Sequence, residues 1–259
     1  MVSAEVRRLI QALENVKWEK VQDSLQRHKP VVVCSATAQA WSDFVGCELE
    51  PVAPRFLEFE KEKLHISELP ASQQHAQMIS SPERFTIRQV REWMACDRST
   101  SFPGLLPHTP DLSFGPDALL PFATPSDPRV LYRRDVQTLK VEIGHYQQWG
   151  LEAPRLDGKA AEWWRFPCVE YILCDKVNDA MDNCTFKLYD RQSSRDFEFL
   201  SSEMPVVEGA ILRLNAHRLL AYSPNQELPL GFPDPVVIDL FAVLKHACHA
   251  LFGHLGLRR

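Results

Sequence analysis

The residues of this chain best suited to chemistry include a lysine and a tyrosine two positions apart in CTFKLYDR, residues 184–191. Alternate side chains of a strand point to opposite faces, so Lys187 and Tyr189 share one face while Phe186 and Leu188 share the other. A tyrosine ring can stack on a base while a neighbouring ammonium group binds phosphate. The pattern therefore predicts a face that binds single-stranded nucleic acid.

Basic and aromatic residues near this strand extend the candidate site. In EGAILRLNAHRLLAY, residues 208–222, Arg213 alternates with Leu212 and Leu214, so the arginine should point away from the core. It would contact a base or phosphate, or lie in solvent as a simple surface charge. Most aromatic side chains here should fill the core, with Tyr189 and two tryptophans exposed. The candidate nucleic-acid-binding residues are Trp163, Trp164, Lys187, Tyr189, Arg191, Phe197, Arg213, His217, Arg218 and Tyr222.

Acidic residues offer a weaker signal for catalysis. Some metal-dependent nucleases use an Asp and a Glu-x-Lys segment, but this chain has the reverse order, Lys140-Val141-Glu142, with Asp135 upstream. Phosphate-binding, serine-hydrolase and zinc-protease motifs are absent from the sequence. We therefore expect no catalytic residues and no cofactor. An enzyme stays open as a third alternative, with a pocket drawn from Glu58, His65, Asp135, Glu142 and His145.

Histidines near the C-terminus suggest a metal site only superficially. His246 and His249 are three residues apart, so they would be neighbours on a helix, and Cys248 and His254 lie nearby. No CxxC half-site accompanies them, and zinc sites usually have a fixed ligand spacing. We expect no metal there.

Four runs rich in β-branched and aromatic residues must position the candidate binding face. They are VEYILCDKV, NCTFKLYD, RDFEFL and GAILRLNAHRLLAY, within residues 169–222, and polar turns separate them. This order predicts a Greek-key barrel of the OB type, whose strand face binds single strands or oligosaccharides. The closing segment, residues 235–259, has apolar residues at helical spacing and predicts a C-terminal helix.

The first half of the chain has a mixed pattern. Helical spacing covers residues 4–27, an apolar strand follows Pro30, residues 54–69 alternate like a half-exposed strand, and residues 80–94 read as a capped helix. Residues 101–128 contain seven prolines and two glycines and predict an ordered, non-regular segment. The fold class is therefore α+β or mainly β. Residues 1–152 form a mixed region, with a degenerate second barrel left open, and residues 153–259 form the barrel and helix.

Composition limits the partners. The chain has 259 residues and a formal net charge of −5, and residues 160–230 carry seven Lys/Arg against eleven Asp/Glu. Strand binding there would have to depend on stacking more than on phosphate neutralisation. The seven scattered cysteines predict free thiols and an intracellular protein. No run is long and apolar enough for a membrane span.

Within residues 165–232 the chain resembles the OB-folds of protection-of-telomeres proteins, which bind single-stranded telomeric DNA. CTFKLYDR and EGAILRLNAHRLLAY carry the likeness. The resemblance implies tandem barrels, bases stacked on aromatic side chains, no catalysis, a nuclear location and partners in a telomere-capping complex. It places Phe186, Lys187, Tyr189, Arg213, His217 and Arg218 near the DNA.

A protein-interaction subunit of a nuclear complex is the main alternative. Its docking surface would come from the segment Pro103 to Pro128 or from the outer face of residues 236–257. Both alternatives predict a chain that binds a partner without breaking bonds.

Overall fold

The computed structural model combines helices with open sheets, so the mixed α+β class is confirmed. It describes residues 2–47, 51–69, 78–80, 90, 93–96, 105, 109–117, 136–152, 155–192, 197 and 202–252. Most of the predicted helix over 80–94 and most of the proline-rich segment lie outside these residues, and Met94, the last residue of that predicted helix, begins a strand. None of the helices in this part of the chain has the length and apolar character that crossing a bilayer requires.

Residues 2–47 and 51–69 form what we call the N-terminal module. Its antiparallel sheet has the order β1-β3-β2, and three helices accompany it. The elements are α1 (Ala4–Glu14), α2 (Trp18–Gln26), β1 (Val31–Ser35), α3 (Ala38–Val45), the 3-10 helix η1 (Pro54–Phe56), β2 (Leu57–Glu60) and β3 (Lys63–Ile66). Leu9, Trp41, Phe44 and Leu64 are among its buried core residues.

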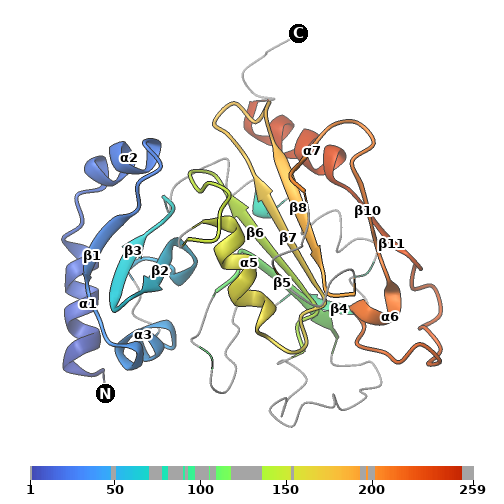
Figure 1. Cartoon of the computed structure of the whole chain (residues 1–259), viewed down its shortest axis with the longest axis horizontal. Helices are drawn as coiled ribbons and strands as arrows, with labels where there is room; N and C mark the ends of the chain where they lie inside the picture. Colours follow the sequence, from blue (N-terminus) through green and yellow to red (C-terminus); the bar gives the residue numbers. More distant parts are fainter. Residues whose placement is uncertain are drawn as a thin grey trace.

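Two sequence-based predictions change in this module. The single helix expected over 4–27 is two helices, because the chain turns between Glu14 and Trp18. The single strand expected over 54–69 is a hairpin, with Lys61 and Glu62 at its turn. Both turn residues have positive φ angles, 49° and 58°, as two-residue hairpin turns of this hand require. The hairpin directs β2 toward the second half of the molecule (Figure 1).

The larger part of the molecule is built on a six-stranded sheet with the order β4-β5-β6-β7-β8-β9. Its strands are β4 (Met94–Cys96), β5 (Leu112–Pro116), β6 (Leu139–Gly144), β7 (Tyr171–Lys176), β8 (Thr185–Asp190) and β9 (Met204–Pro205). β6 and β7 are parallel, and helix α5 (Leu156–Trp164) connects them as a crossover. The predicted domain boundary near residue 153 falls inside this β6–α5–β7 unit.

Both faces of the six-stranded sheet are covered. On one face, Ile172, Cys174 and Tyr189 pack with α5. On the other face, Leu139, Val141 and Leu173 pack with the C-terminal elements (Figure 1). These elements are β10 (Ile211–Leu214), α6 (Ala216–Leu219), β11 (Val236–Asp239) and α7 (Leu240–Phe252). The helix predicted over residues 235–259 is confirmed for α7, but its first residues form β11 instead, and residues 253–259 lie outside the described part of the chain.

In the described part of the chain, the strands form open sheets and none closes into a barrel. The run 208–222, expected as one long strand, is the short strand β10 followed by the helical turn α6. β10 pairs with β11 in a separate two-stranded sheet instead of joining β7 and β8. The expected strand order of an OB barrel is therefore not what these residues build.

Candidate functional site

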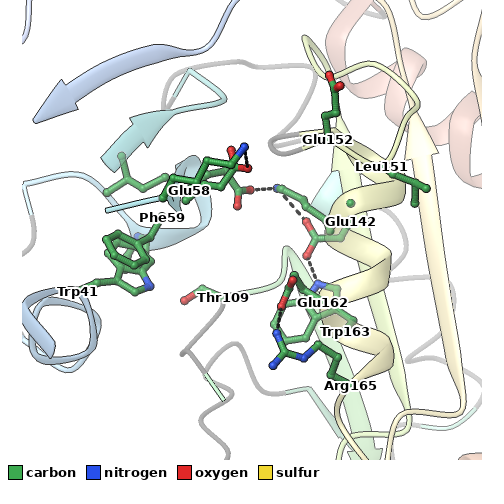
Figure 2. A pocket seen from close by; sticks show the side chains of 16 residues that line it. Trp41, Glu58, Phe59, Thr109, Glu142, Leu151, Glu152, Glu162, Trp163 and Arg165 are labelled. Carbon is green, nitrogen blue, oxygen red and sulfur yellow. Dashed lines mark hydrogen bonds and ion pairs between the residues drawn. The ribbon is translucent and has the colours of Figure 1, made fainter. Parts of the chain in front are cut away.

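A cavity of about 350 Å³ lies where the N-terminal module meets α5 and β6 (Figure 2). β2 contributes Glu58 to its wall, β6 contributes Glu142, and α5 contributes Lys159 and Trp163. Polar groups from β2 and from the consecutive elements β6 and α5, which are distant from β2 in sequence, thus meet in one concave space. Such convergence in a pocket is the usual mark of a binding or catalytic site.

A buried lysine joins two glutamates in this cavity. The Lys159 ammonium donates to Glu142 Oε2 at 3.1 Å and lies 3.2 Å from Glu58 Oε1. The three side chains are only 10%, 2% and 12% exposed, respectively. The indole N–H of Trp163 donates to the other Glu142 oxygen at 2.6 Å. Glu142 is therefore held from both oxygens by α5.

The secondary structure explains this arrangement. Lys159 and Trp163 are four residues apart, so they project from the same side of α5. On β6, Val141 packs in the core beneath α7, and Glu142 as the next residue points toward α5. Glu58 reaches the cavity from β2, an edge strand of its sheet.

A further carboxylate lies beside Glu142. Leu112 on β5 is paired with Val141 on β6, so Asp111 lies next to Glu142 across the two antiparallel strands. Asp111 is 1% exposed, and its Oδ2 accepts the backbone N–H of Ile143 at 2.7 Å. Leu112 and Val141 point to the α7 side of the sheet, so Asp111 and Glu142, their neighbours along the chain, both point to the α5 side.

Burial and charge act in opposite directions on these groups. Burial raises the pKa of Glu142 to about 7, the charge of Asp111 adds to this rise, and the Lys159 cation opposes it. Burial alone would lower the pKa of Lys159, but the charges of Glu142 and Glu58 outweigh burial and raise it well above its ordinary value. Lys159 is therefore a permanent cation, and Glu142 gains or loses its proton near neutral pH.

The carboxylates could hold a divalent cation with help from substrate and water. Among the described residues, no three His, Cys, Asp or Glu side chains are already grouped to hold a metal ion. Mg²⁺ needs fewer protein ligands, because it usually binds one or two carboxylates and completes its octahedron with waters and substrate phosphate. Asp111 and Glu142 are the neighbouring carboxylates that would hold it, and because both Glu142 oxygens already accept hydrogen bonds from α5, the cation would have to replace the Lys159 or the Trp163 contact.

Some of the five residues named for the enzyme alternative lie in this cavity and others do not. Glu58 and Glu142 both line it. His65 lies opposite Glu58 in the β2–β3 pairing, and His145 instead pairs with Asp179 at 2.7 Å. Asp135 lies outside the described residues. The sequence reading missed two residues, Asp111 and Lys159, and the available signals were an aspartate just before a strand and a lysine one helical turn before Trp163.

The structure does not expose the predicted stacking residues. Tyr189 is 1% exposed and Trp163 is 2% exposed, so the prediction that they are exposed is wrong. Tyr189 stacks on Phe197 with ring centroids 5.3 Å apart, and its hydroxyl donates to Asp157. Lys187 pairs with the same carboxylate at 2.8 Å. The face expected to bind bases packs against α5, and the DNA-binding role of these residues stays a prediction.

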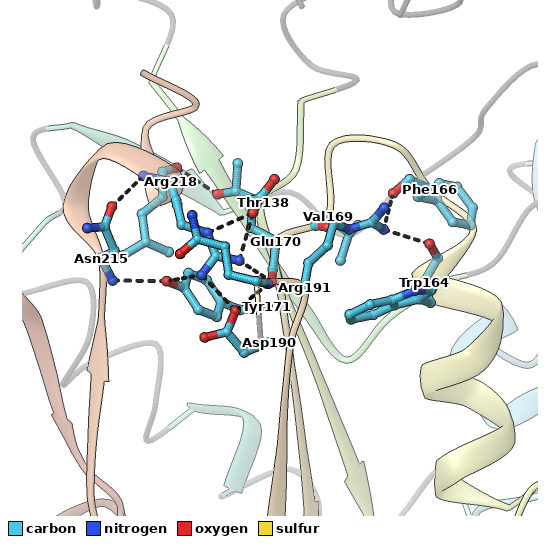
Figure 3. A network of polar contacts seen from close by, with 12 residues as sticks. Thr138, Trp164, Phe166, Val169, Glu170, Tyr171, Asp190, Arg191, Asn215 and Arg218 are labelled. Atoms are coloured by element: carbon cyan, nitrogen blue, oxygen red, sulfur yellow. Dashed lines mark hydrogen bonds and ion pairs between the residues drawn. The ribbon is translucent and has the colours of Figure 1, made fainter. Parts of the chain in front are cut away.

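Two of the predicted DNA-binding arginines support the fold (Figure 3). Arg218 on α6 pairs with Glu170 at 2.8 Å and with Asp190 at 2.7 Å, and also donates to the Tyr171 hydroxyl. Arg191 donates to three backbone carbonyls near the end of α5, those of Trp164, Phe166 and Val169, at 2.6 to 3.0 Å. Arg218 thereby attaches the α6 turn to the start of β7 and the end of β8.

The remaining predicted residues are dispersed. Arg213 is exposed between buried Leu212 and Leu214, which confirms the predicted alternation but places it on a different sheet from Lys187. Trp164 is half-buried against Phe197. Tyr222 is buried, and the His217 ring hydrogen-bonds the Gln226 carbonyl at 2.9 Å. The ten residues therefore do not form one face.

A scan against models of protein families finds none that matches this chain. A search of curated proteins finds no similar sequence either. Function must therefore follow from the geometry of the described residues.

Proposed function

We propose that this protein hydrolyses phosphodiester bonds of nucleic acid with the help of a divalent cation. The observation that carries the proposal is the buried Lys159 ammonium between Glu142 and Glu58, in a cavity that a substrate group can enter. A cation and carboxylates in a water-poor site are the groups that stabilise the charge of a transferring phosphoryl group. This proposal takes up the enzyme alternative.

Each residue has a role in the proposed reaction. Asp111 and Glu142 would hold the cation, which when bound would supply neutralisation of the charge on the phosphoryl oxygens. Lys159 holds a phosphoryl oxygen and stabilises the added charge, since it keeps its proton. Glu58 accepts the proton of the attacking water. The water oxygen bonds to phosphorus, the bond to the leaving oxygen breaks, and a proton from solvent neutralises that oxygen.

The expectation from the resemblance remains testable beside this proposal. Non-catalytic binding of single-stranded telomeric DNA would require exposed aromatic and basic side chains on one surface. The buried Tyr189 and the paired Lys187 favour a structural role for that face. Nucleic acid is common to both proposals, and bond cleavage separates them.

The experiment follows labelled single-stranded DNA, duplex DNA and RNA with Mg²⁺, Mn²⁺ or EDTA. We expect metal-dependent cleavage of at least one substrate. Glu142→Gln and Lys159→Met should each lower kcat at least 100-fold, which is typical for the loss of one electrostatic contact. The matched control is Lys20→Met, which changes an exposed lysine of α2.

Unchanged cleavage in Glu142→Gln, or full activity in EDTA, would contradict the proposal. Tight binding of G-rich single strands without cleavage would instead support the telomere-type binding expected from the resemblance.

A further inference from the structure

A second cavity, of about 320 Å³, lies beside the first. Its wall is formed by the end of α2, the start of β1 and the loop between β6 and α5. Glu152 from that loop lines both cavities. A ligand long enough to pass Glu152 could therefore occupy both spaces at once.

The linings of the two cavities differ in charge. Five glutamates line the first cavity: Glu58, Glu60, Glu142, Glu152 and Glu162. Of the described residues that line the second cavity, Glu152 is the only acid, and Arg155 and His28 accompany it. Amide side chains of Gln147 and Gln148 complete much of its polar wall. Lys61, Lys159 and Arg165 also line the first cavity, so its charge is mixed with an excess of acids, whereas the second cavity suits an anion.

Arg155 is available to a ligand. Its guanidinium lies 3.7 Å from Glu152, and the two side chains are 49% and 86% exposed. An exposed pair at this distance contributes little, so an incoming anion can replace Glu152 at small cost. A planar guanidinium can bind phosphate through two parallel hydrogen bonds. The contact of Arg155 with Glu152, at 3.7 Å, does not provide such a pair of bonds.

His28 is held at the rim of the cavity by its surroundings. Its backbone has a φ of 56°, and its Nδ1 lies 3.1 Å from the Tyr146 carbonyl and 2.9 Å from Gln148 Nε2. Gln148 in turn accepts a hydrogen bond from the Lys176 ammonium at 2.7 Å. The His28 ring and the Lys176 ammonium both contact Gln148, which belongs to the loop that separates the cavities.

We propose that the second cavity binds a phosphate group of the nucleic-acid strand whose neighbouring phosphate is cleaved in the first cavity. Arg155 is the principal contact and His28 the second. This assignment rests on the proposed function, since it names the second contact of the same substrate. It also implies that a single mononucleotide is a poorer ligand than an oligonucleotide that reaches both cavities.

The test measures oligonucleotide affinity by fluorescence anisotropy in the Glu142→Gln background, so that the strand stays intact. Arg155→Gln should raise Kd about 5- to 10-fold and reduce the slope of log K against log salt by about 1. In the cleavage-competent protein, the same change should raise KM with little effect on kcat. The matched control is Arg7→Gln, an exposed arginine of α1 that lines neither cavity.

Oligonucleotide affinity and salt slope unchanged by Arg155→Gln would overturn the inference, even with cleavage still dependent on Glu142. Stabilisation by inorganic phosphate that requires Arg155, with oligonucleotide affinity unchanged, would also overturn it, since the cavity would then take free phosphate. Arg155-dependent oligonucleotide binding without cleavage under any condition would support the phosphate contact while removing the proposed hydrolysis. Equal losses of oligonucleotide affinity in Arg7→Gln and Arg155→Gln would overturn the assignment, because they would show that the affinity depends on net charge and not on a contact in the second cavity.

Discussion

At the residue scale, Asp175 is a buried carboxylate on the α7 side of β7. It is 3% exposed, and neither of its oxygens has a hydrogen-bond partner among the described residues. Burial raises the pKa of Asp175 to about 7 from an ordinary value of 3.8. Between these pH values the folded protein holds a proton that the unfolded chain releases, so this group lowers stability as pH rises.

Asp175→Asn should therefore stabilise the protein at pH 8, by up to about 4 kcal/mol, since the neutral amide has no charge to bury. The difference from wild type should be small at pH 4.5 and should grow as pH rises to 7. Urea unfolding at a series of pH values measures it. A difference that is independent of pH would show that Asp175 titrates normally.

Tyr189 provides the residue-scale test of the stacking hypothesis. Tyr189→Phe removes the hydroxyl that donates to Asp157 but keeps the buried ring. We expect a loss of about 1–2 kcal/mol in the free energy of unfolding, because Asp157 then lacks one of its donors. Denaturant unfolding measures this loss. Unchanged stability together with weaker DNA binding would instead support the prediction that Tyr189 contacts nucleic acid.

At the element scale, Arg218 should be the main attachment of the β10–α6 corner. Arg218→Met leaves Glu170 and Asp190 without this cation and should cost about 2–3 kcal/mol. In this variant the amides of α6 should exchange hydrogen faster than they do in the wild type, and this increase should be larger than that for the amides of β7. The matched control, Arg213→Met, changes an exposed arginine on β10 and should have little effect. Equal effects of the two changes would show that the corner is held by apolar packing.

The alternation of Lys187 and Tyr189 with Phe186 and Leu188 could be predicted from the sequence. What those faces contact could not. A strand of an antiparallel barrel packs against the core with one face and often meets solvent with the other. In contrast, β8 lies in a sheet that is covered on both faces. The cause is the parallel pairing of β6 with β7, 32 residues apart along the chain, which local periodicity does not reveal.

The candidate site could be predicted only in part for a similar reason. Glu58 and Glu142 were among the acidic candidates, because acids in strand-like segments stand out. Asp111 becomes their neighbour through the β5–β6 register, and Lys159 through the packing of α5 on the sheet. A search for the contiguous Glu-x-Lys order therefore misses a lysine that is supplied by a helix.

At the scale of the whole molecule, cation binding should stabilise the fold. The site joins β5, β6, α5 and the N-terminal module, so a bound cation favours the assembled state. Mg²⁺ at 100 times its Kd should add about 2.7 kcal/mol and raise Tm. Calorimetry with and without Mg²⁺ measures this rise. Glu142→Gln should abolish it, while Glu14→Gln, at an exposed glutamate of α1, should retain it.

The separate core of the N-terminal module also bears on the order in which the molecule is made. Every strand pairing of that module closes within residues 31–66, so a chain leaving the ribosome can complete it early. The six-stranded sheet needs β9, and its second face needs α7 near the end of the chain. Glu58 should therefore lie in a finished module before β6 and α5, which carry Glu142 and Lys159, have been synthesised.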